Sequence, residues 1–450
     1  MKFCSDFVWG AATAAYQIEG GAAEGGRTPS IWDTFSHTPG KTANGETGDV
    51  ASDSYHRFKE DVVIMRSMHL KAYRFSVSWS RVAVDGADRW NPEGFAYYDA
   101  LVDELLANGI TPYLTLYHWD LPQALQNKGG WLNEDTARAF AVYAAKLGEH
   151  FKGRVKYWFT LNEPACVVGL GYGNGLHAPG LKLNLQEQFL CWQNLVYAHC
   201  LAEEALHKAD PANVVGLAST GRLCYPVEET PQDLDAARAL TFSCPDDDWT
   251  FTHQMMLDPL VLGRWPNDCG PQLAACIARV PEHITAALPL GKPDVIGLNI
   301  YNAAPVRMGT AGPEYCCRPT GWPRTALGWP VEPESLNWGV RLVYERYRTP
   351  LYITENGLSC CDQVFLDGKV HDPQRIDFMT RYLSCLHQAI SQGADVRGYF
   401  HWSLLDNYEW HSGYNERFGL VFVDYPTGTR IPKDSADWYG TLARTGELNG

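Results

Sequence analysis

Residues 351–357 read Leu-Tyr-Ile-Thr-Glu-Asn-Gly, and residues 156–163 read Lys-Tyr-Trp-Phe-Thr-Leu-Asn-Glu. Each is a short, apolar, β-rich run with a glutamate at or near its end. Strands of nearly continuous apolar character are typical of parallel sheets, whose strands are buried on both faces. Burying a carboxylate is costly, so the two glutamates indicate a site rather than packing.

Six further runs of the same kind bring the total to eight. They cover residues 7–13, 72–79, 111–119, 214–220, 294–301 and 396–404. Helical patterns separate the runs, near residues 55–69, 93–108, 134–150, 187–209, 235–257, 334–348, 373–393 and 433–444. Strict alternation of strands and helices predicts an α/β protein with a closed parallel (β/α)8 TIM barrel and elaborated βα loops. The competing fold, an open doubly wound sheet, would need a glycine-rich phosphate turn after the first strand, and none follows it.

The length of 450 residues alone would fit two or three domains. Barrels with insertions, however, often exceed 400 residues as one domain. No low-complexity tract, charge block or linker marks a boundary in the sequence. We therefore expect residues 1–450 to form a single catalytic barrel domain.

In such a barrel, catalytic groups lie at the C-terminal ends of the strands. The chemically suggestive side chains fall there: Gln17, His118, Trp119, Asn162, Glu163, Asn299, Tyr301, Glu355 and Trp402. Glu163 and Glu355 end the fourth and seventh predicted strands and can face each other across the mouth. Glycoside hydrolysis requires such a pair, about 5–5.5 Å apart in a retaining enzyme. The alternative, a buried arginine partner for each glutamate, is weaker because the two occupy equivalent strand ends.

Several stretches resemble glycoside hydrolase family 1, the β-glucosidase family. Residues 160–164 (Thr-Leu-Asn-Glu-Pro) resemble its acid/base motif, and residues 353–357 (Ile-Thr-Glu-Asn-Gly) resemble its nucleophile motif. Residues 7–20, 117–122 and 401–410 resemble further signatures of the family, and the likeness extends from about residue 5 to 440. Five motifs in the right order on the right strands are a specific signal.

The resemblance implies a role for each carboxyl group. Glu355 is expected to attack the anomeric carbon, and Glu163 to act first as acid and then as base. Arg74 and Tyr301 are expected to hydrogen-bond Glu355 and keep it ionised, with Asn299 in support. The charge of Glu355 should raise the pKa of Glu163, which pushes the pKa values of the two groups apart.

The resemblance also implies a sugar pocket. Gln17, His118, Glu409 and Trp410 are expected to hold the sugar hydroxyls, and Asn162 to contact the 2-OH. For His118 taken alone, a core histidine whose hydrogen bonds are satisfied within the protein would be the commoner interpretation. Its position at a strand end favours contact with a ligand. Trp402 is the expected sugar platform. Trp119 and Trp329 are assigned to the aglycone side.

Four positions bear on the substrate. Family members that act on 6-phosphoglycosides carry Ser at position 409 and then Lys and Tyr, where this chain has Glu409, Glu416 and Phe418. Carboxylates repel a phosphate dianion, so we expect an unphosphorylated sugar. Ala165 stands where many members have an aromatic residue, which should reshape the aglycone entrance.

Composition excludes several other function classes. A net charge of −15 argues against nucleic acid and against an anionic membrane surface. No apolar run approaches the roughly 18 residues of a membrane span. Thirteen cysteines, no evident signal peptide at the N-terminus and no sequon favour free thiols in the cytoplasm. The sequence has no metal-binding motif, and the expected mechanism needs no cofactor.

The predicted function is hydrolysis of terminal non-reducing β-D-glucosides, with β-galactosides and β-fucosides as further substrates. The expected partners are small β-glycosides or oligosaccharides such as cellobiose. A transglycosidase would use the same residues. A catalytically inactive sugar-binding barrel would lack a catalytic glutamate, and both are present here. The sequence indicates no oligomeric state.

Overall fold

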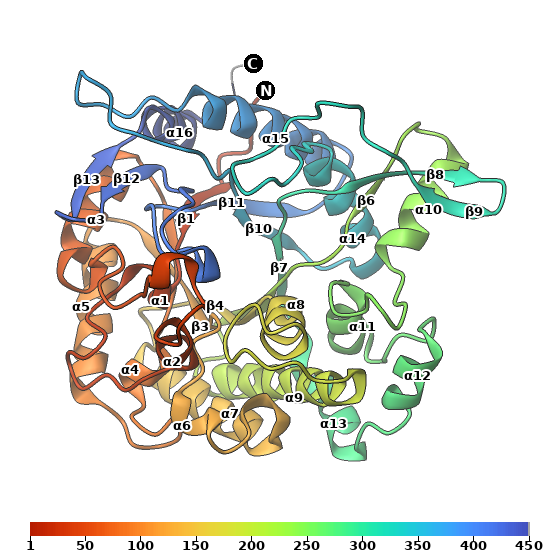
Figure 1. The fold of residues 1–450 in the computed structure, drawn as a ribbon, viewed down its shortest axis with the longest axis horizontal. Helices are drawn as coiled ribbons and strands as arrows, with labels where there is room; N and C mark the ends of the chain where they lie inside the picture. Colours follow the sequence, from red (N-terminus) through yellow and green to blue (C-terminus); the bar gives the residue numbers. More distant parts are fainter. Residues whose placement is uncertain (449–450) are drawn as a thin grey trace.

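The computed structural model describes residues 1–448 and contains a closed barrel of eight parallel strands (Figure 1). The strand order around the barrel is β1-β11-β10-β7-β5-β4-β3-β2. The bounds are β1 (Val8–Ala12), β2 (Ala72–Ser76), β3 (Thr111–Tyr117), β4 (Tyr157–Asn162), β5 (Val214–Ser219), β7 (Val295–Asn299), β10 (Leu351–Asn356) and β11 (Val396–Trp402). The predicted (β/α)8 fold is confirmed, and each observed barrel strand lies within one of the eight predicted runs.

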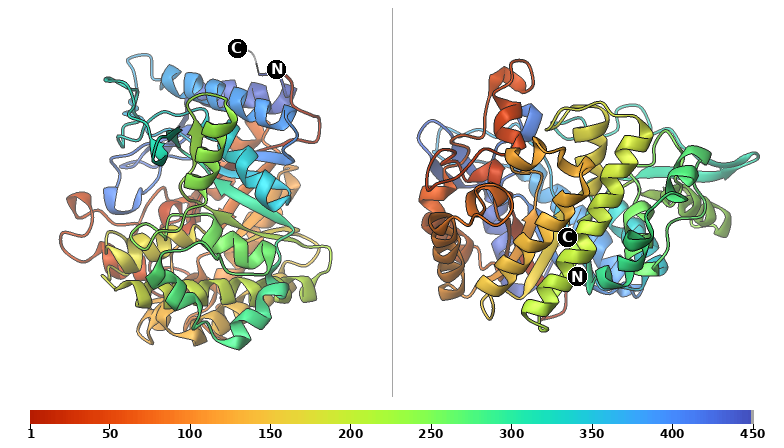
Figure 2. Two further views of the ribbon diagram at one scale, coloured as in Figure 1. Left: turned by 90° about the vertical axis from the view of Figure 1, so that its right-hand side faces the viewer. Right: turned by 90° about the horizontal axis from the view of Figure 1, so that it is seen from below.

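Helices surround the barrel. They include α3 (Ser54–Ser67), α5 (Pro92–Ala107), α7 (Glu134–His150), α9 (Leu185–Ala209), α10 (Pro231–Thr241), α11 (Gln254–Leu262), α14 (Val340–Tyr347), α15 (Pro373–Ser391) and α16 (Asp434–Thr445). Helices α7 and α9 pack against each other along one flank, as the two views of Figure 2 show. No helix within residues 1–448 is both long and apolar enough to cross a bilayer.

The prediction of one helix near 235–257 was wrong. The segment contains α10 and α11, with irregular chain over residues 242–253 between them. Pro245 has no amide hydrogen to donate and disfavours helical geometry in the residue before it. The Arg222 guanidinium also bonds the freed carbonyl oxygens of Leu240, at 2.9 Å, and Ser243, at 2.8 Å. Local chain chemistry and a side chain from a distant loop thus end α10.

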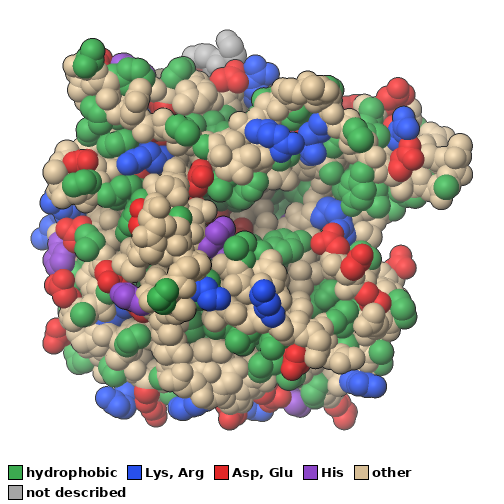
Figure 3. All heavy atoms as spheres, in the orientation of Figure 1, with side chains coloured by type: hydrophobic (Ala, Val, Ile, Leu, Met, Phe, Trp, Pro, Cys, Tyr) green, Lys and Arg blue, Asp and Glu red, His purple; other side chains and the backbone are tan. Residues whose placement is uncertain are grey.

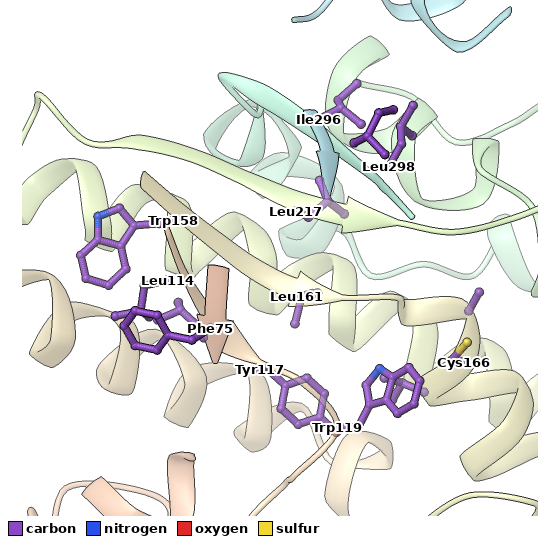
Figure 4. Packing of buried hydrophobic residues seen from close by; sticks show 14 of the residues in the cluster. Phe75, Leu114, Tyr117, Trp119, Trp158, Leu161, Cys166, Leu217, Ile296 and Leu298 are labelled. Atoms are coloured by element: carbon purple, nitrogen blue, oxygen red, sulfur yellow. The ribbon is translucent and has the colours of Figure 1, made fainter. Parts of the chain in front are cut away.

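Side chains of the barrel strands alternate between two apolar clusters, as the two-residue period of a strand requires. Tyr113 and Phe159 belong to the cluster inside the barrel, whereas their neighbours Leu114 and Trp158 belong to the large outer cluster. Figure 4 shows Leu114 and Trp158 in this outer layer together with Phe75. Burial of each such side chain contributes about 1.5–3 kcal/mol.

Two small sheets extend the loops. Strands β6 (Cys224–Pro226), β8 (Ala304–Gly309) and β9 (Gly312–Tyr315) form one, and its β8–β9 hairpin projects from the body in Figure 1. Strands β12 (Val421–Asp424) and β13 (Thr429–Pro432) form the other. After β4, the chain turns into the short helix α8 (Pro164–Cys166) and a π-helix over Val167–Gly173. The segments around α8, β6 and β8 contribute residues to the wall of a cavity above the C-terminal strand ends.

Candidate active site

A cavity of about 800 Å³ lies at the C-terminal ends of the barrel strands. Figure 3 shows a hollow near the centre of this face of the molecule. Ten of the predicted site residues line the cavity: His118, Trp119, Glu163, Asn299, Tyr301, Trp329, Glu355, Trp402, Glu409 and Trp410. Gln17, Arg74 and Asn162 are fully buried and contact these residues from behind. The structure therefore brings all thirteen together.

The strand ends position the two glutamates. Glu163 follows Asn162, the last residue of β4, and Glu355 is the last residue but one of β10. Strand register places Glu355 directly beside Asn299, the last residue of β7. Closing the sheet into a barrel also brings Asn299 to Glu163, which lies 136 positions away in the sequence.

Glu355 is held by strong donors. Nη1 of Arg74 donates to its Oε1 at 2.7 Å, and the hydroxyl of Tyr301 donates to its Oε2 at 2.8 Å. Burial raises the pKa of Glu355, while the charge of Arg74 and the hydrogen bonds from Arg74, Tyr301 and Asn299 oppose that rise. These contacts favour the ionised carboxylate, the form that can attack an electrophilic carbon.

Glu163 has weaker partners. Nδ2 of Asn299 donates to its Oε1 at 2.8 Å, and the thiol of Cys166 donates to its Oε2 at 3.0 Å. Burial, and next the charge of Glu355, raise the pKa of Glu163 to about 7. A carboxyl group with that pKa holds its proton in nearly neutral solution and can donate it. Cys166 is not among the residues predicted from the sequence, although its place three residues after Glu163 in a turn of helix was a usable signal.

An amide network fixes the floor between the two carboxyl groups. Oδ1 of Asn162 accepts from Nη2 of Arg74 at 2.6 Å and from Nδ2 of Asn299 at 3.1 Å. Nδ2 of Asn162 faces Nε2 of His118 at 3.1 Å. Since Arg74 can only donate, the amide orientation of Asn162 is determined, and Nε2 of His118 accepts. Burial and the charge of Arg74 hold the pKa of His118 well below its usual range.

Two buried polar atoms at the inner end have no hydrogen-bond partner within residues 1–448: Oε1 of Gln17 and Nδ1 of His118. The Nε2 of Gln17 is fully used, with Asn407 Oδ1 at 3.0 Å, the Tyr408 carbonyl at 2.9 Å and Glu409 Oε2 at 3.3 Å. Burial and the charge of Glu355 raise the pKa of Glu409 to about 8. Buried polar groups are normally satisfied, so these two atoms are available to hydrogen-bond a polar ligand.

Aromatic rings form the wall of the same cavity. Trp402 lies nearly parallel to the ring of His118, with centroids 5.7 Å apart, and Trp410 packs on Trp119 at 4.6 Å. Trp329 packs against Tyr301 at 5.2 Å, so it stands over the side of the cavity that holds Glu355. Ring faces of this kind pack well against the C–H groups of a sugar.

The backbone is strained at three of these residues. Trp119, Glu163 and Trp410 have φ angles of 80°, 47° and 53°, in the left-handed region that L-residues rarely adopt. Such strain persists only where the surrounding structure enforces it, and it concentrates at functional sites. No pattern in the sequence indicated it.

The outer part of the cavity comes from loops that the sequence analysis left unassigned. Arg222, Asp248, Arg318 and Leu170 line it. The two arginines are paired, Arg222 with Asp248 and Arg318 with Glu332. Ala165 is buried and is not among the lining residues, so its expected effect on the entrance stays a prediction.

Comparison with known proteins agrees with this geometry. The model of the family described as glycosyl hydrolase family 1 matches residues 1–448. β-Glucosidase A of Thermotoga maritima is 42% identical over 453 residues, which cover 99% of each chain. A bifunctional β-D-glucosidase/β-D-fucosidase of Bifidobacterium breve is 40% identical and covers 98% of this chain and 97% of its own.

Solved structures of the Thermotoga maritima β-glucosidase superpose over the whole length of both chains. The complex with castanospermine has a TM-score of 0.90 at 40% identity, and the complex with galacto-hydroximolactam has a TM-score of 0.89 at 40% identity. The family match spans almost the whole chain, and the paired carboxyl groups lie where the motifs place them. The protein is therefore a member of glycosyl hydrolase family 1.

Proposed function

We propose that the protein is a retaining β-glucosidase that hydrolyses terminal non-reducing β-D-glucosides, with Glu355 as nucleophile and Glu163 as acid and base. The observation that carries this proposal is the unequal surroundings of two buried carboxyl groups in one cavity. Arg74 and Tyr301 donate to Glu355, whereas the donors to Glu163 within residues 1–448 are an amide and a thiol. Unequal surroundings separate a nucleophile from an acid.

In the first step, an oxygen of Glu355 attacks the anomeric carbon. The bond from that carbon to the leaving oxygen breaks, and Glu163 gives this oxygen its proton. The aglycone leaves as an alcohol, and the sugar is held as an ester of Glu355. The 2-OH of the sugar is placed to meet Asn162, whose amide Arg74 and Asn299 orient.

The second step reverses the role of Glu163. The ester of Glu355 carries no negative charge, so one cause of the raised pKa of Glu163 disappears. Glu163 then takes a proton from a water molecule, which attacks the anomeric carbon. The carbon–oxygen bond to Glu355 breaks and the carboxylate is restored. The configuration at the anomeric carbon is retained because two inversions occur.

The substrate range follows from the inner end of the cavity and from the relatives. Gln17, His118, Glu409 and Trp410 are the proposed contacts to the sugar hydroxyls, and Trp402 is the proposed platform. Where family members that act on 6-phosphoglycosides carry Ser, Lys and Tyr, this chain has Glu409, Glu416 and Phe418, none of which supplies a positive charge for a phosphate group, so the proposed sugar is unphosphorylated. The Bifidobacterium breve relative also carries a fucosidase name, and we include β-fucosides, β-galactosides and oligosaccharides such as cellobiose.

The thirteen cysteines, all free thiols in the structure, favour a reducing compartment such as the cytoplasm.

The test is release of nitrophenol from the aryl β-D-glucoside, β-D-galactoside, β-D-fucoside and 6-phospho-β-D-glucoside. We expect turnover of the three unphosphorylated substrates and a loss of roughly 10⁴-fold or more in Glu355→Ala. Glu345→Ala, which removes an exposed carboxylate paired with Arg238, is the control and should keep full activity. Activity on the phosphorylated substrate alone would contradict the proposed pocket. An added alcohol acceptor would reveal transfer in competition with hydrolysis.

A further inference from the structure

A second group of ionisable side chains lies at the opposite end of the barrel from the cavity. Asp294 immediately precedes β7, whereas Asn299 at the other end of that strand lines the cavity. A strand of five residues rises about 3.3 Å per residue, so the group lies roughly 17 Å from the floor of the site. Its members do not take part in the proposed mechanism.

Helix α9 supplies the other members. His199, Glu203 and His207 follow one another at intervals of four residues, so they share one face of the helix. Nε2 of His207 lies 3.2 Å from Oδ2 of Asp294 and 3.9 Å from Oε1 of Glu203. One ligand atom from each of Glu203, His207 and Asp294 lies within 4.8 Å of the other two. We name these three residues the α9–β7 cluster.

Glu203 is the unusual member because it is buried without adequate compensation. Its residue is 2% exposed, and its Oε2 has no hydrogen-bond partner within residues 1–448. Nε2 of His199 lies 3.2 Å from that oxygen but donates instead to the carbonyl of Gly291 at 3.0 Å. A buried carboxylate without hydrogen bonds is costly. Because His199 is engaged with Gly291, the carboxylates of Glu203 and Asp294 share the one remaining imidazole, that of His207.

The other two members are accessible and oriented. The side chains of His207 and Asp294 are 33% and 43% exposed, so an ion can reach them from solvent. The backbone amide of Val215 donates to Oδ2 of Asp294 at 2.9 Å, which fixes that carboxylate as outer partners fix metal ligands.

From this geometry we propose that the α9–β7 cluster binds a divalent cation of the zinc class. One imidazole and two carboxylates are ligands that Zn²⁺ accepts, and water would complete the four-coordinate shell. The imidazole ligand favours a transition metal over Ca²⁺ or Mg²⁺, which prefer oxygen ligands only. The ion would neutralise Glu203 and link the end of α9 to the start of β7. It serves stability rather than catalysis.

The test uses the full chain, freed of metal with a chelator and titrated with ZnCl2 at about pH 8, where an ordinary histidine is neutral. Calorimetry should show a site that is lost, or at least tenfold weaker, in His207→Ala and in the isosteric Glu203→Gln. Zinc at a hundredfold excess over Kd should raise the Tm of the wild type by about 3 °C, and that of the variants not at all. Because all variants keep the thirteen cysteines, binding to thiols cancels in the comparison.

His283→Ala is the matched control. His283 also lies 3.0 Å from a carboxylate, that of the partly exposed Glu134, but no third ligand within residues 1–448 joins them. This variant should bind zinc and gain stability as the wild type does. Equal zinc binding and equal Tm shifts in the wild type, His207→Ala and Glu203→Gln would overturn the proposal, as would a response to Ca²⁺ or Mg²⁺ alone. Hydrolysis of aryl glucosides at 25 °C should be unchanged in His207→Ala, which separates this proposal from that of the active site.

Discussion

The inner end of the cavity and its outer rim differ in the burial of their residues and in the elements that supply them. At the inner end, Gln17, His118 and Asn162 are fully buried, and each lies at or just after a barrel strand. At the rim, Arg222 and Arg318 are partly exposed and come from loops, and each is paired with a carboxylate. The inner end therefore holds one ligand geometry, whereas the rim can accommodate several. We expect substitutions at the inner end to lower kcat, and substitutions at the rim to change KM.

Glu163→Gln should give the largest difference between two substrates, because it removes the proton donor and keeps the shape of the side chain. General acid catalysis contributes about 10²–10⁴-fold, so kcat/KM for cellobiose should fall by that amount. A dinitrophenyl glucoside has a leaving group that needs no proton, so its first step should be nearly unaffected. Steady-state kinetics of the wild type and the variant with each substrate gives the two losses in kcat/KM that are compared. Equal losses on the two substrates would contradict the acid role of Glu163.

Glu409→Ser tests a residue of the inner end that takes no part in the bond-breaking steps. A hydrogen bond involving a carboxyl group is worth about 1.5–3 kcal/mol, so kcat/KM for the glucoside should fall about 10- to 100-fold. If Glu409 contacts a sugar hydroxyl, a substrate deoxygenated at that position should lose less. Glu416→Ser is the comparison, because Glu416 is less buried and does not line the cavity. An equal response to every deoxy substrate would indicate a structural role.

The burial of Glu163 should also determine how the activity depends on pH. Glu163 acts as acid only while protonated, and burial with the charge of Glu355 raises its pKa to about 7. Activity should be present below this pH and fall about tenfold per unit as the pH rises above it. In Glu163→Gln the residual activity on cellobiose should show no such decline. A decline that persists at the same pH in the variant would assign it to another group.

The smallest effect is expected at the rim. Trp329→Ala removes a ring that packs on Tyr301 and lines the cavity. Loss of one aromatic contact is worth about 0.5–1.5 kcal/mol, so KM for cellobiose should rise about 2- to 10-fold with little change in kcat. Trp322→Ala, from the same loop but outside the cavity, is the control. A large loss of kcat in Trp329→Ala would place this residue with the inner end instead.

The fold could be predicted from the sequence because the eight strand runs carry a local signal. A strand buried on both faces must be apolar along its length, and each run is separated from the next by helical periodicity. The carboxyl residues at the ends of β4 and β10 stood out for the same reason, since charge inside an apolar run has a cost. Short helices such as α12 (Pro271–Ile277) were missed because they have too few turns to show a period.

The sequence by itself determined the barrel, the two glutamates and their order along the chain, because these follow from local polarity and from short motifs. Only the tertiary structure decided which side chains meet. The amide of Asn299, which donates to both Asn162 and Glu163, meets these residues only through strand register and barrel closure. The same holds for the α9–β7 cluster, whose Asp294 comes from a distant segment. A contact between remote residues does not alter the local sequence pattern of either partner, so it could be identified only in the folded structure.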